Sequence, residues 1–118
     1  MKTIGPSFIA LQVRDLDASA RFYTQELGLD PAAQSPPGAV VFATTPIPFA
    51  VRVPSVDLSE VEHLGWGVAL WLKADDPSSL HEKLAGADVS IVTPPFEGPF
   101  GLTFAFEDPD GYIITIHG

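Results

Sequence analysis

The sequence has no cysteine, few basic residues and no long apolar run, and each shortage removes a class of function. Without cysteine there is no disulfide framework, thiolate metal site or cysteine nucleophile. Six lysines and arginines against 15 aspartates and glutamates give a net charge of −9, too few cations for a nucleic-acid face or an anionic membrane surface. No segment is long and apolar enough to span a membrane or resembles a signal peptide, so we expect a cytoplasmic protein.

The remaining composition is that of an ordinary folded domain. Of 118 residues, 46% are hydrophobic and 18% are charged, which excludes disorder as the main state. A chain of this length buries a real but shallow core. Its negative charge favours a cationic small molecule as partner over an anionic polymer.

Apolar spacing and capping residues predict two helices. Residues 16–27 place apolar side chains three or four positions apart, after an N-cap at Asp15 and before a left-handed C-terminal residue at Gly28. Residues 77–85 form the second helix, with Asp76 as N-cap.

Apolar runs of four to seven residues predict the strands. The segment 31–38 contains three prolines and is a weak edge strand or a loop, and 94–99 is predicted as a loop able to cover a site. Residues 108–111 (Asp-Pro-Asp-Gly) fit a type I turn. The expected strands are 7–13, 39–44, 49–53, 66–72, 89–92, 102–106 and 112–116.

The two halves of the chain repeat one another. Residues 10–14 (Ala-Leu-Gln-Val-Arg) align with 69–73 (Ala-Leu-Trp-Leu-Lys) at an offset of half the chain length. Each half reads strand, helix and then about three strands, too little to fold alone. We therefore expect a single domain over residues 1–118, made of a first module over about 1–54, a linker over about 55–65 and a second module over about 66–118.

Several motifs together resemble the vicinal-oxygen-chelate superfamily of glyoxalases, extradiol dioxygenases and bleomycin-resistance proteins. They are residues 10–19, the Phe22-Tyr23 pair, Leu27-Gly28-Leu29 and the late 108–112 segment. The resemblance implies an α+β fold of two tandem βαβββ modules. Their strands, about eight in all, would form one cupped mixed sheet with the helices on the outer face and the ligand inside.

The resemblance also locates the positions that hold metal in the family's enzymes. They fall on Phe8, Gly67, Thr115 and either Ala50 or Arg52. None of these side chains offers the imidazole or carboxylate that a divalent metal needs. We therefore expect no metal, no other cofactor and no catalytic residue, and the chain is closest in character to the metal-free bleomycin-resistance type.

Strand alternation predicts which side chains face the cup. Small residues leave volume there, and aromatic residues such as Trp71 supply flat apolar walls. Each aromatic is as readily explained by core packing, and Arg52 either pairs with a ligand carboxylate or lies in solvent. The predicted pocket residues are Phe8, Ala10, Gln12, Arg52, Gly67, Ala69, Trp71, Phe96, Phe100, Ile113, Thr115 and His117.

These observations favour a non-catalytic protein that binds and sequesters an antibiotic or aromatic metabolite, aromatic or cationic in character. One alternative is a metal-dependent lyase, isomerase or dioxygenase with atypical ligands such as Glu107 and His117. Another is an interaction domain with no ligand. We also expect a homodimer, since sheet edges and a high apolar content favour a covering partner. The segments 31–38 and 94–101 are the candidates for a shared roof.

Overall fold

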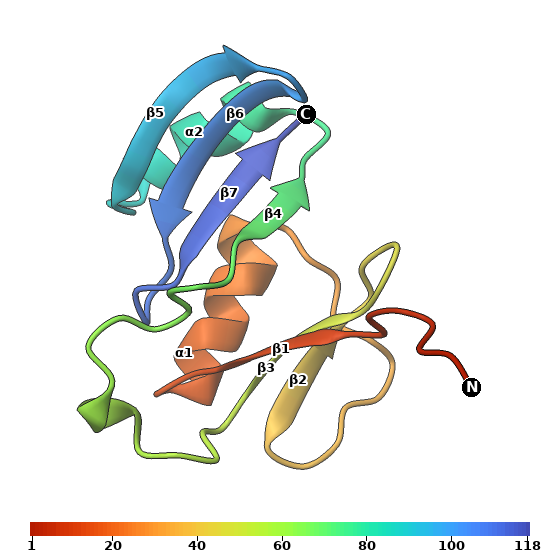
Figure 1. The fold of residues 1–118 in the computed structure, drawn as a ribbon. Helices are drawn as coiled ribbons and strands as arrows, with labels where there is room; N and C mark the ends of the chain where they lie inside the picture. Colours follow the sequence, from red (N-terminus) through yellow and green to blue (C-terminus); the bar gives the residue numbers. More distant parts are fainter. The chain divides into compact units, whose positions relative to one another are not determined.

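The computed structural model describes all 118 residues as two compact units, Met1–Glu60 and Val61–Gly118. Both units begin with a strand, continue with a helix and end with further strands (Figure 1). The α+β fold of two βαβββ modules is therefore confirmed. No helix combines the length and apolar character that a membrane crossing needs.

The first unit contains a three-stranded sheet with the order β1-β3-β2. Strand β1 (Ile9–Gln12) runs parallel to β3 (Phe49–Arg52), and β2 (Ala39–Phe42) pairs antiparallel with β3. Apolar side chains at alternate positions of these strands pack against the helical segment, because successive side chains point to opposite faces. The most buried members of this core are Val13, Tyr23, Phe42, Phe49 and Val51.

The helix of the first unit is shorter as an α-helix than its sequence spacing predicts. Helix α1 covers Leu16–Arg21, and the chain continues as a π-helix over Phe22–Glu26. The N-cap prediction is confirmed, since the Asp15 carboxylate accepts a hydrogen bond from the Ala18 N–H at 3.0 Å. Gly28 ends the helical segment with a φ of +73°, as expected for a left-handed C-terminal residue.

The proline-rich segment 31–38 is a loop and not a strand. Its only β-bridge is an isolated one between Pro31 and Phe42 at the outer edge of β2. Prolines have no N–H to give to a ladder, so the fourth strand of this module does not form. The molecule thus has seven strands in sheets of three and four, where the sequence predicted about eight in one sheet.

The second unit contains a four-stranded sheet with the order β4-β7-β6-β5. Its strands are β4 (Leu70–Lys73), β5 (Ile91–Gly98), β6 (Gly101–Glu107) and β7 (Ile113–His117). Only the β4–β7 pair is parallel. This repeats the first unit, where the opening strand also lies parallel to the last.

Helix α2 (Pro77–Gly86) packs against β5 and β6 and begins at the predicted N-cap, Asp76. The core of this unit consists of Leu84, Phe104, Phe106, Ile114 and Ile116, all essentially buried. The predicted turn over residues 108–111 is confirmed by a hydrogen bond from the Gly111 N–H to the Asp108 carbonyl oxygen at 3.0 Å.

The strand predicted over residues 66–72 is wrong in its first half. Gly65 and Gly67, just before and inside this segment, have φ values of +80° and +95°, which lie outside the extended conformation. Val68 is consequently 73% exposed, although alternation placed it against the helix. The strand begins only at Leu70.

The loop predicted over residues 94–99 is also wrong. Strand β5 continues to Gly98, and Gly98 pairs directly with Gly101 across a tight turn. Pro94 and Pro95 fit because β5 is an edge strand and shifts register between Ile91 and Phe96. The predicted linker 55–65 contains a single 3-10 turn over Leu58–Glu60.

A candidate ligand pocket

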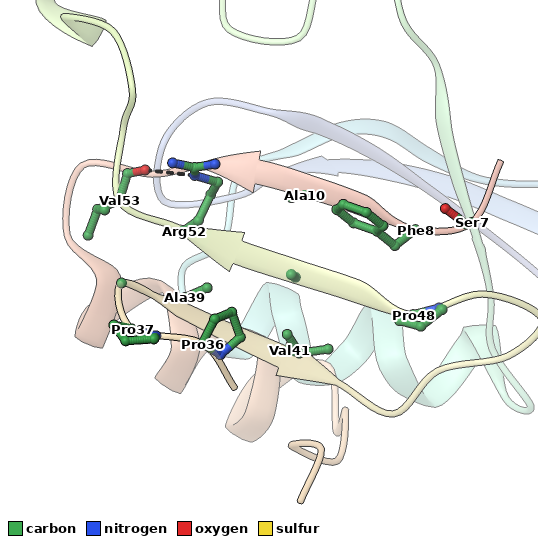
Figure 2. Close-up of a pocket in the computed structure, with 12 residues that line it drawn as sticks. Ser7, Phe8, Ala10, Pro36, Pro37, Ala39, Val41, Pro48, Arg52 and Val53 are labelled. Atoms are coloured by element: carbon green, nitrogen blue, oxygen red, sulfur yellow. Dashed lines mark hydrogen bonds between the residues drawn. The ribbon is translucent and has the colours of Figure 1, made fainter. Parts of the chain in front are cut away.

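The first unit carries a pocket on the face of its sheet that points away from the buried core (Figure 2). Its volume is about 560 Å³, within the range of small-molecule sites in proteins. All of its lining residues belong to Met1–Glu60. They are Ser7, Phe8, Ala10, Pro36, Pro37, Gly38, Ala39, Val41, Pro48, Ala50, Arg52 and Val53.

Small side chains from three strands form the floor of the pocket. Ala10 of β1 lies directly opposite Ala50 of β3, and Ala50 lies opposite Val41 of β2. These residues share one face of the sheet, because the alternate residues Leu11, Phe49 and Val51 point into the core. The pocket exists because methyl groups occupy positions where larger side chains would fill the space.

The proline-rich loop forms one wall and is held to the sheet by hydrogen bonds. The Val53 N–H donates to the Gly38 carbonyl oxygen at 2.9 Å, and the Ala39 N–H donates to the Pro36 carbonyl oxygen at 3.2 Å. The Ser35 hydroxyl accepts from the Val41 N–H at 2.9 Å. The segment that fails to form a fourth strand therefore has a defined position beside the floor.

Phe8 and Arg52 lie at opposite ends of the floor (Figure 2). Phe8 precedes β1 and is 63% exposed, so its ring offers an apolar surface at the mouth of the pocket. Arg52 ends β3, and its Nε–H donates to the Val53 carbonyl oxygen at 3.0 Å. This hydrogen bond fixes the direction of the guanidinium, while no carboxylate of the chain pairs with it.

The lining of the pocket is almost entirely apolar. The Ser7 hydroxyl and the Arg52 guanidinium are its only polar side chains. The two carboxyls with shifted pKa values lie elsewhere: hydrogen bonds from Ser59 lower the pKa of Asp57, and hydrogen bonds from Ser79 lower the pKa of Asp76. The pocket lining contains no carboxyl or imidazole able to act as a general acid or base.

The structure brings together three of the predicted pocket residues of the first unit, namely Phe8, Ala10 and Arg52. Gln12, the fourth, does not line the pocket. Its Oε1 atom accepts hydrogen bonds from the Ser55 N–H at 2.7 Å and the Ser55 hydroxyl at 3.0 Å. The other predicted residues lie in the second unit: Gly67, Ala69, Trp71, Phe96, Phe100, Ile113, Thr115 and His117.

Three of those residues form an aromatic cluster in the second unit. The Trp71 ring centroid lies 6.1 Å from that of Phe100 and 6.0 Å from that of His117, and Phe100 lies 6.0 Å from His117. Trp71 is 48% exposed and Phe100 is 62% exposed. Phe96 is on β5 opposite Thr103, Ile113 and Thr115 are on β7, and Gly67 and Ala69 precede β4.

Sequence reasoning missed the floor of β2 and the proline wall. The prediction from alternation covers residues 7–13, 66–72 and 112–116 and does not extend to the strand 39–44. Applied to residues 39–42, it places Ala39 and Val41 on the face opposite the buried Phe42. The prolines at 36 and 37 gave no local signal that their segment folds back along the sheet.

None of the positions corresponding to the family's metal ligands carries an imidazole or a carboxylate. No group of three or more histidine, cysteine, aspartate or glutamate residues in the chain could hold a metal ion. Glu107 and His117, the predicted atypical ligands, lie at opposite ends of the β6–β7 ladder. At roughly 3.3 Å per residue they are about 13 Å apart along the sheet, too far to share one ion.

Comparisons with known proteins agree with this architecture. A glyoxalase-related enzyme from Fulvimarina pelagi is 26% identical with a TM-score of 0.71, over 96% of this chain and 86% of that chain. An antibiotic binding protein from Streptomyces sp. CB03234 is 23% identical with a TM-score of 0.72, over 99% and 97%. A lactoylglutathione lyase from Agrobacterium tumefaciens is 19% identical with a TM-score of 0.67, over 99% and 95%.

These similarities, two of them below 25% identity, show a shared fold. The activities named for those proteins are not thereby assigned to this chain. No curated protein matches the chain. The sequence model of one family, described as the Glyoxalase/Bleomycin resistance protein/Dioxygenase superfamily, matches residues 5–116. With nearly the whole chain matched and both modules in place, this chain belongs to the glyoxalase/bleomycin resistance/dioxygenase superfamily.

Proposed function

We propose that the protein is a non-catalytic binder that sequesters a small, flat, largely apolar molecule in the pocket of its first unit. The observation that carries this proposal is the floor made by Ala10, Ala50 and Val41. It leaves about 560 Å³ beside the ring of Phe8 and the proline wall. An apolar cavity of this size with one or two polar groups suits a planar ligand.

Binding without catalysis is supported by the residue types at the family's metal positions. Phe8, Gly67 and Thr115 offer no imidazole or carboxylate, and neither Ala50 nor Arg52 can replace them. The pocket likewise contains no acid–base pair or nucleophile beyond the single Ser7 hydroxyl, which no histidine accompanies in the lining.

The class of ligand is proposed from the pocket together with the comparison proteins. One similar structure is an antibiotic binding protein, and it covers nearly all of this chain. An antibiotic or aromatic metabolite with a fused-ring body would match the apolar lining. Holding such a compound would keep it away from its target.

A ligand screen by thermal shift tests this proposal. Untagged protein is screened against antibiotics and fused-ring metabolites, with and without divalent metals, and its metal content is measured. We expect stabilisation by an apolar compound that does not depend on metal. A stoichiometric bound metal with turnover of the compound would refute a non-catalytic role.

A pocket-filling variant assigns the binding to this pocket. Ala10→Phe places a ring over the floor, and Ala39→Phe does so from the opposite edge strand. Both alanines are partly exposed, so the larger side chain extends into the cavity and not into the core. We expect either variant to fold, as judged by its melting curve, and to lose the ligand-induced shift.

The homodimer also belongs to this proposal. Strands β1 and β4 are edges of their sheets, and large apolar side chains such as Trp66 and Phe100 are exposed. Such edges and side chains favour pairing with a second copy. Sedimentation equilibrium over a range of concentrations should give twice the chain mass, and a mass that stays near 12.6 kDa would end the idea.

A further inference from the structure

We infer that the pocket selects an anionic ligand, an apolar ring system carrying a carboxylate, which Arg52 binds. This inference rests on the proposed function, because it assigns the charge of the ligand for the same pocket. It departs from the expectation drawn from the net charge of −9, which favours cations.

The guanidinium of Arg52 is arranged to receive an anion. Its Nε–H is used by the Val53 carbonyl oxygen at 3.0 Å, which leaves both terminal NH₂ groups pointing away from that bond. A carboxylate accepts two parallel hydrogen bonds from such a pair of groups. No acidic side chain of the chain occupies them, so a ligand meets no internal competitor.

The remaining lining gives a cation no anionic or imidazole partner. It contains no aspartate, no glutamate and no histidine, and a single hydroxyl at Ser7. An ammonium placed there would lose its hydration shell and lie in the same small cavity as a guanidinium. Both effects oppose binding, because burying an unpaired charge and bringing like charges together are each unfavourable.

The shape of the pocket separates an apolar end from a charged end. Phe8 is level with the start of β3 and Arg52 is level with its end (Figure 2). Four residues of extended chain span roughly 13 Å, about the length of a fused two- or three-ring acid. The ring system would lie on Ala10 and Ala50 beside Phe8, and its carboxylate would reach Arg52.

The charge distribution of the chain is compatible with an anionic ligand in the first unit. The first unit holds four of the six basic residues and six of the 15 acidic residues, a net charge of only −2. None of its six acidic residues lines the pocket. The second unit has a net charge of −7 and therefore holds most of the negative charge of the chain.

Three probes with one ring system and different head groups test the inference by calorimetry. Naphthoate is an anion, naphthamide is neutral and naphthylmethylammonium is a cation at neutral pH. We expect naphthoate to bind about tenfold more tightly than naphthamide, as charge-assisted hydrogen bonds at a half-open site do, and the ammonium to bind most weakly. Equal binding of naphthoate and naphthamide, or tightest binding of the ammonium, would overturn the inference.

Two matched charge variants assign the preference to one arginine. Arg52→Gln should remove the advantage of naphthoate over naphthamide. Arg21→Gln removes the same charge from the same unit at the end of α1, outside the pocket, and should keep the advantage. An advantage that survives Arg52→Gln, or that Arg21→Gln also removes, contradicts a role for Arg52.

The neutral probe keeps failure of this inference distinct from failure of the proposed function. Naphthamide binding by the wild type that is lost in Ala10→Phe supports the pocket whatever the charge preference. If none of the three probes binds, or if Ala10→Phe binds naphthamide as well as the wild type does, the proposed function fails and the charge preference with it.

Discussion

The two units of this chain repeat one fold, yet they present different surfaces on the sheet face that points away from the core. In the first unit, one row across three strands reads Ala10, Ala50 and Val41. In the second unit a row on the same face, from β4 through β7 to β6, reads Trp71, Thr115 and Ala105, and by the sequence repeat its first member corresponds to Gln12. The amide of Gln12, which turns to Ser55 in one module, is thus an indole in the other.

This difference teaches that side-chain size, and not the fold, decides what each sheet face can do. The first row leaves a cavity of about 560 Å³, while Trp71 in the second packs with Phe100 and His117. The fourth strand differs as well, since a proline loop borders the first sheet where β5 borders the second. A duplicated module has in this way kept its core and diversified its other face.

The comparison first predicts that the core faces of the two units contribute equally to the free energy of unfolding. Phe49 in the first unit is 4% exposed and packs on Tyr23, and Phe104 in the second is fully buried beside Phe106. Phe49→Ala and Phe104→Ala should each lower the free energy of unfolding by about 3–5 kcal/mol, because each leaves a cavity. Urea denaturation measures both, and a loss below about 1 kcal/mol in one of them would break the equivalence.

The second prediction concerns Trp71, the indole in the row of the second unit. Trp71→Ala should lower the free energy of unfolding by about 2 kcal/mol or less, because half of the side chain is already exposed. A loss of 3–5 kcal/mol would make Trp71 a core residue. A titration with naphthamide alongside tests the sequence prediction that Trp71 contacts ligand.

Much of each module could be predicted from its sequence because the signals are local. The aspartate caps, the apolar spacing of the helices and the Asp-Pro-Asp-Gly turn all act within four residues. The features that failed depend on distant neighbours. Pro94 and Pro95 fit in a strand only because β5 is at the edge of its sheet, and sequence does not show strand order.

The residues of the candidate pocket also divide into those that local sequence predicts and those that depend on distant contacts. Phe8 and Ala10 could be predicted from alternation in their strand, whereas the sequence left Arg52 between the pocket and solvent. Pro36 and Pro37 could not, because they reach the pocket through a loop whose path is set by the Val53–Gly38 hydrogen bond. Gln12 alternates correctly but turns its side-chain oxygen to Ser55, a contact 43 positions away.

The third prediction tests whether the proline wall needs its glycine. Gly38 has a φ of +78°, and a Cβ there would lie 3.1 Å from Cγ2 of Val53. Gly28 has a similar φ of +73° and open space around it, so it is a matched control. Gly28→Ala should cost about 1 kcal/mol from backbone strain alone, and Gly38→Ala should cost more.

Ligand binding should also differ between the Gly38 and Gly28 variants. Gly38→Ala displaces the wall and should weaken naphthamide binding, whereas Gly28→Ala lies away from the pocket and should not. Calorimetry with both variants measures this. Equal stability losses and unchanged binding in both would show that the wall position does not depend on Gly38.

The smallest expected effect concerns the helix caps, which differ between the units by one hydroxyl. At the third helical position after the cap, the first unit has Ala18 and the second has Ser79. The Ser79 hydroxyl donates to the Asp76 carboxylate at 2.7 Å and its N–H donates at 3.1 Å. These two hydrogen bonds lower the pKa of Asp76 below its ordinary value of 3.8.

A lowered pKa in the folded state fixes the sign of the pH dependence. The stability that ionised Asp76 contributes is present above pH 3.8 and is lost as the pH falls through the lower, folded pKa. Ser79→Ala removes the stronger donor, so the pKa of Asp76 should rise towards 3.8 and less stability should be lost on acidification. Carboxyl NMR titration of the wild type and the variant measures the shift, and an unchanged pKa would show that the hydroxyl hydrogen bond adds nothing to the backbone cap.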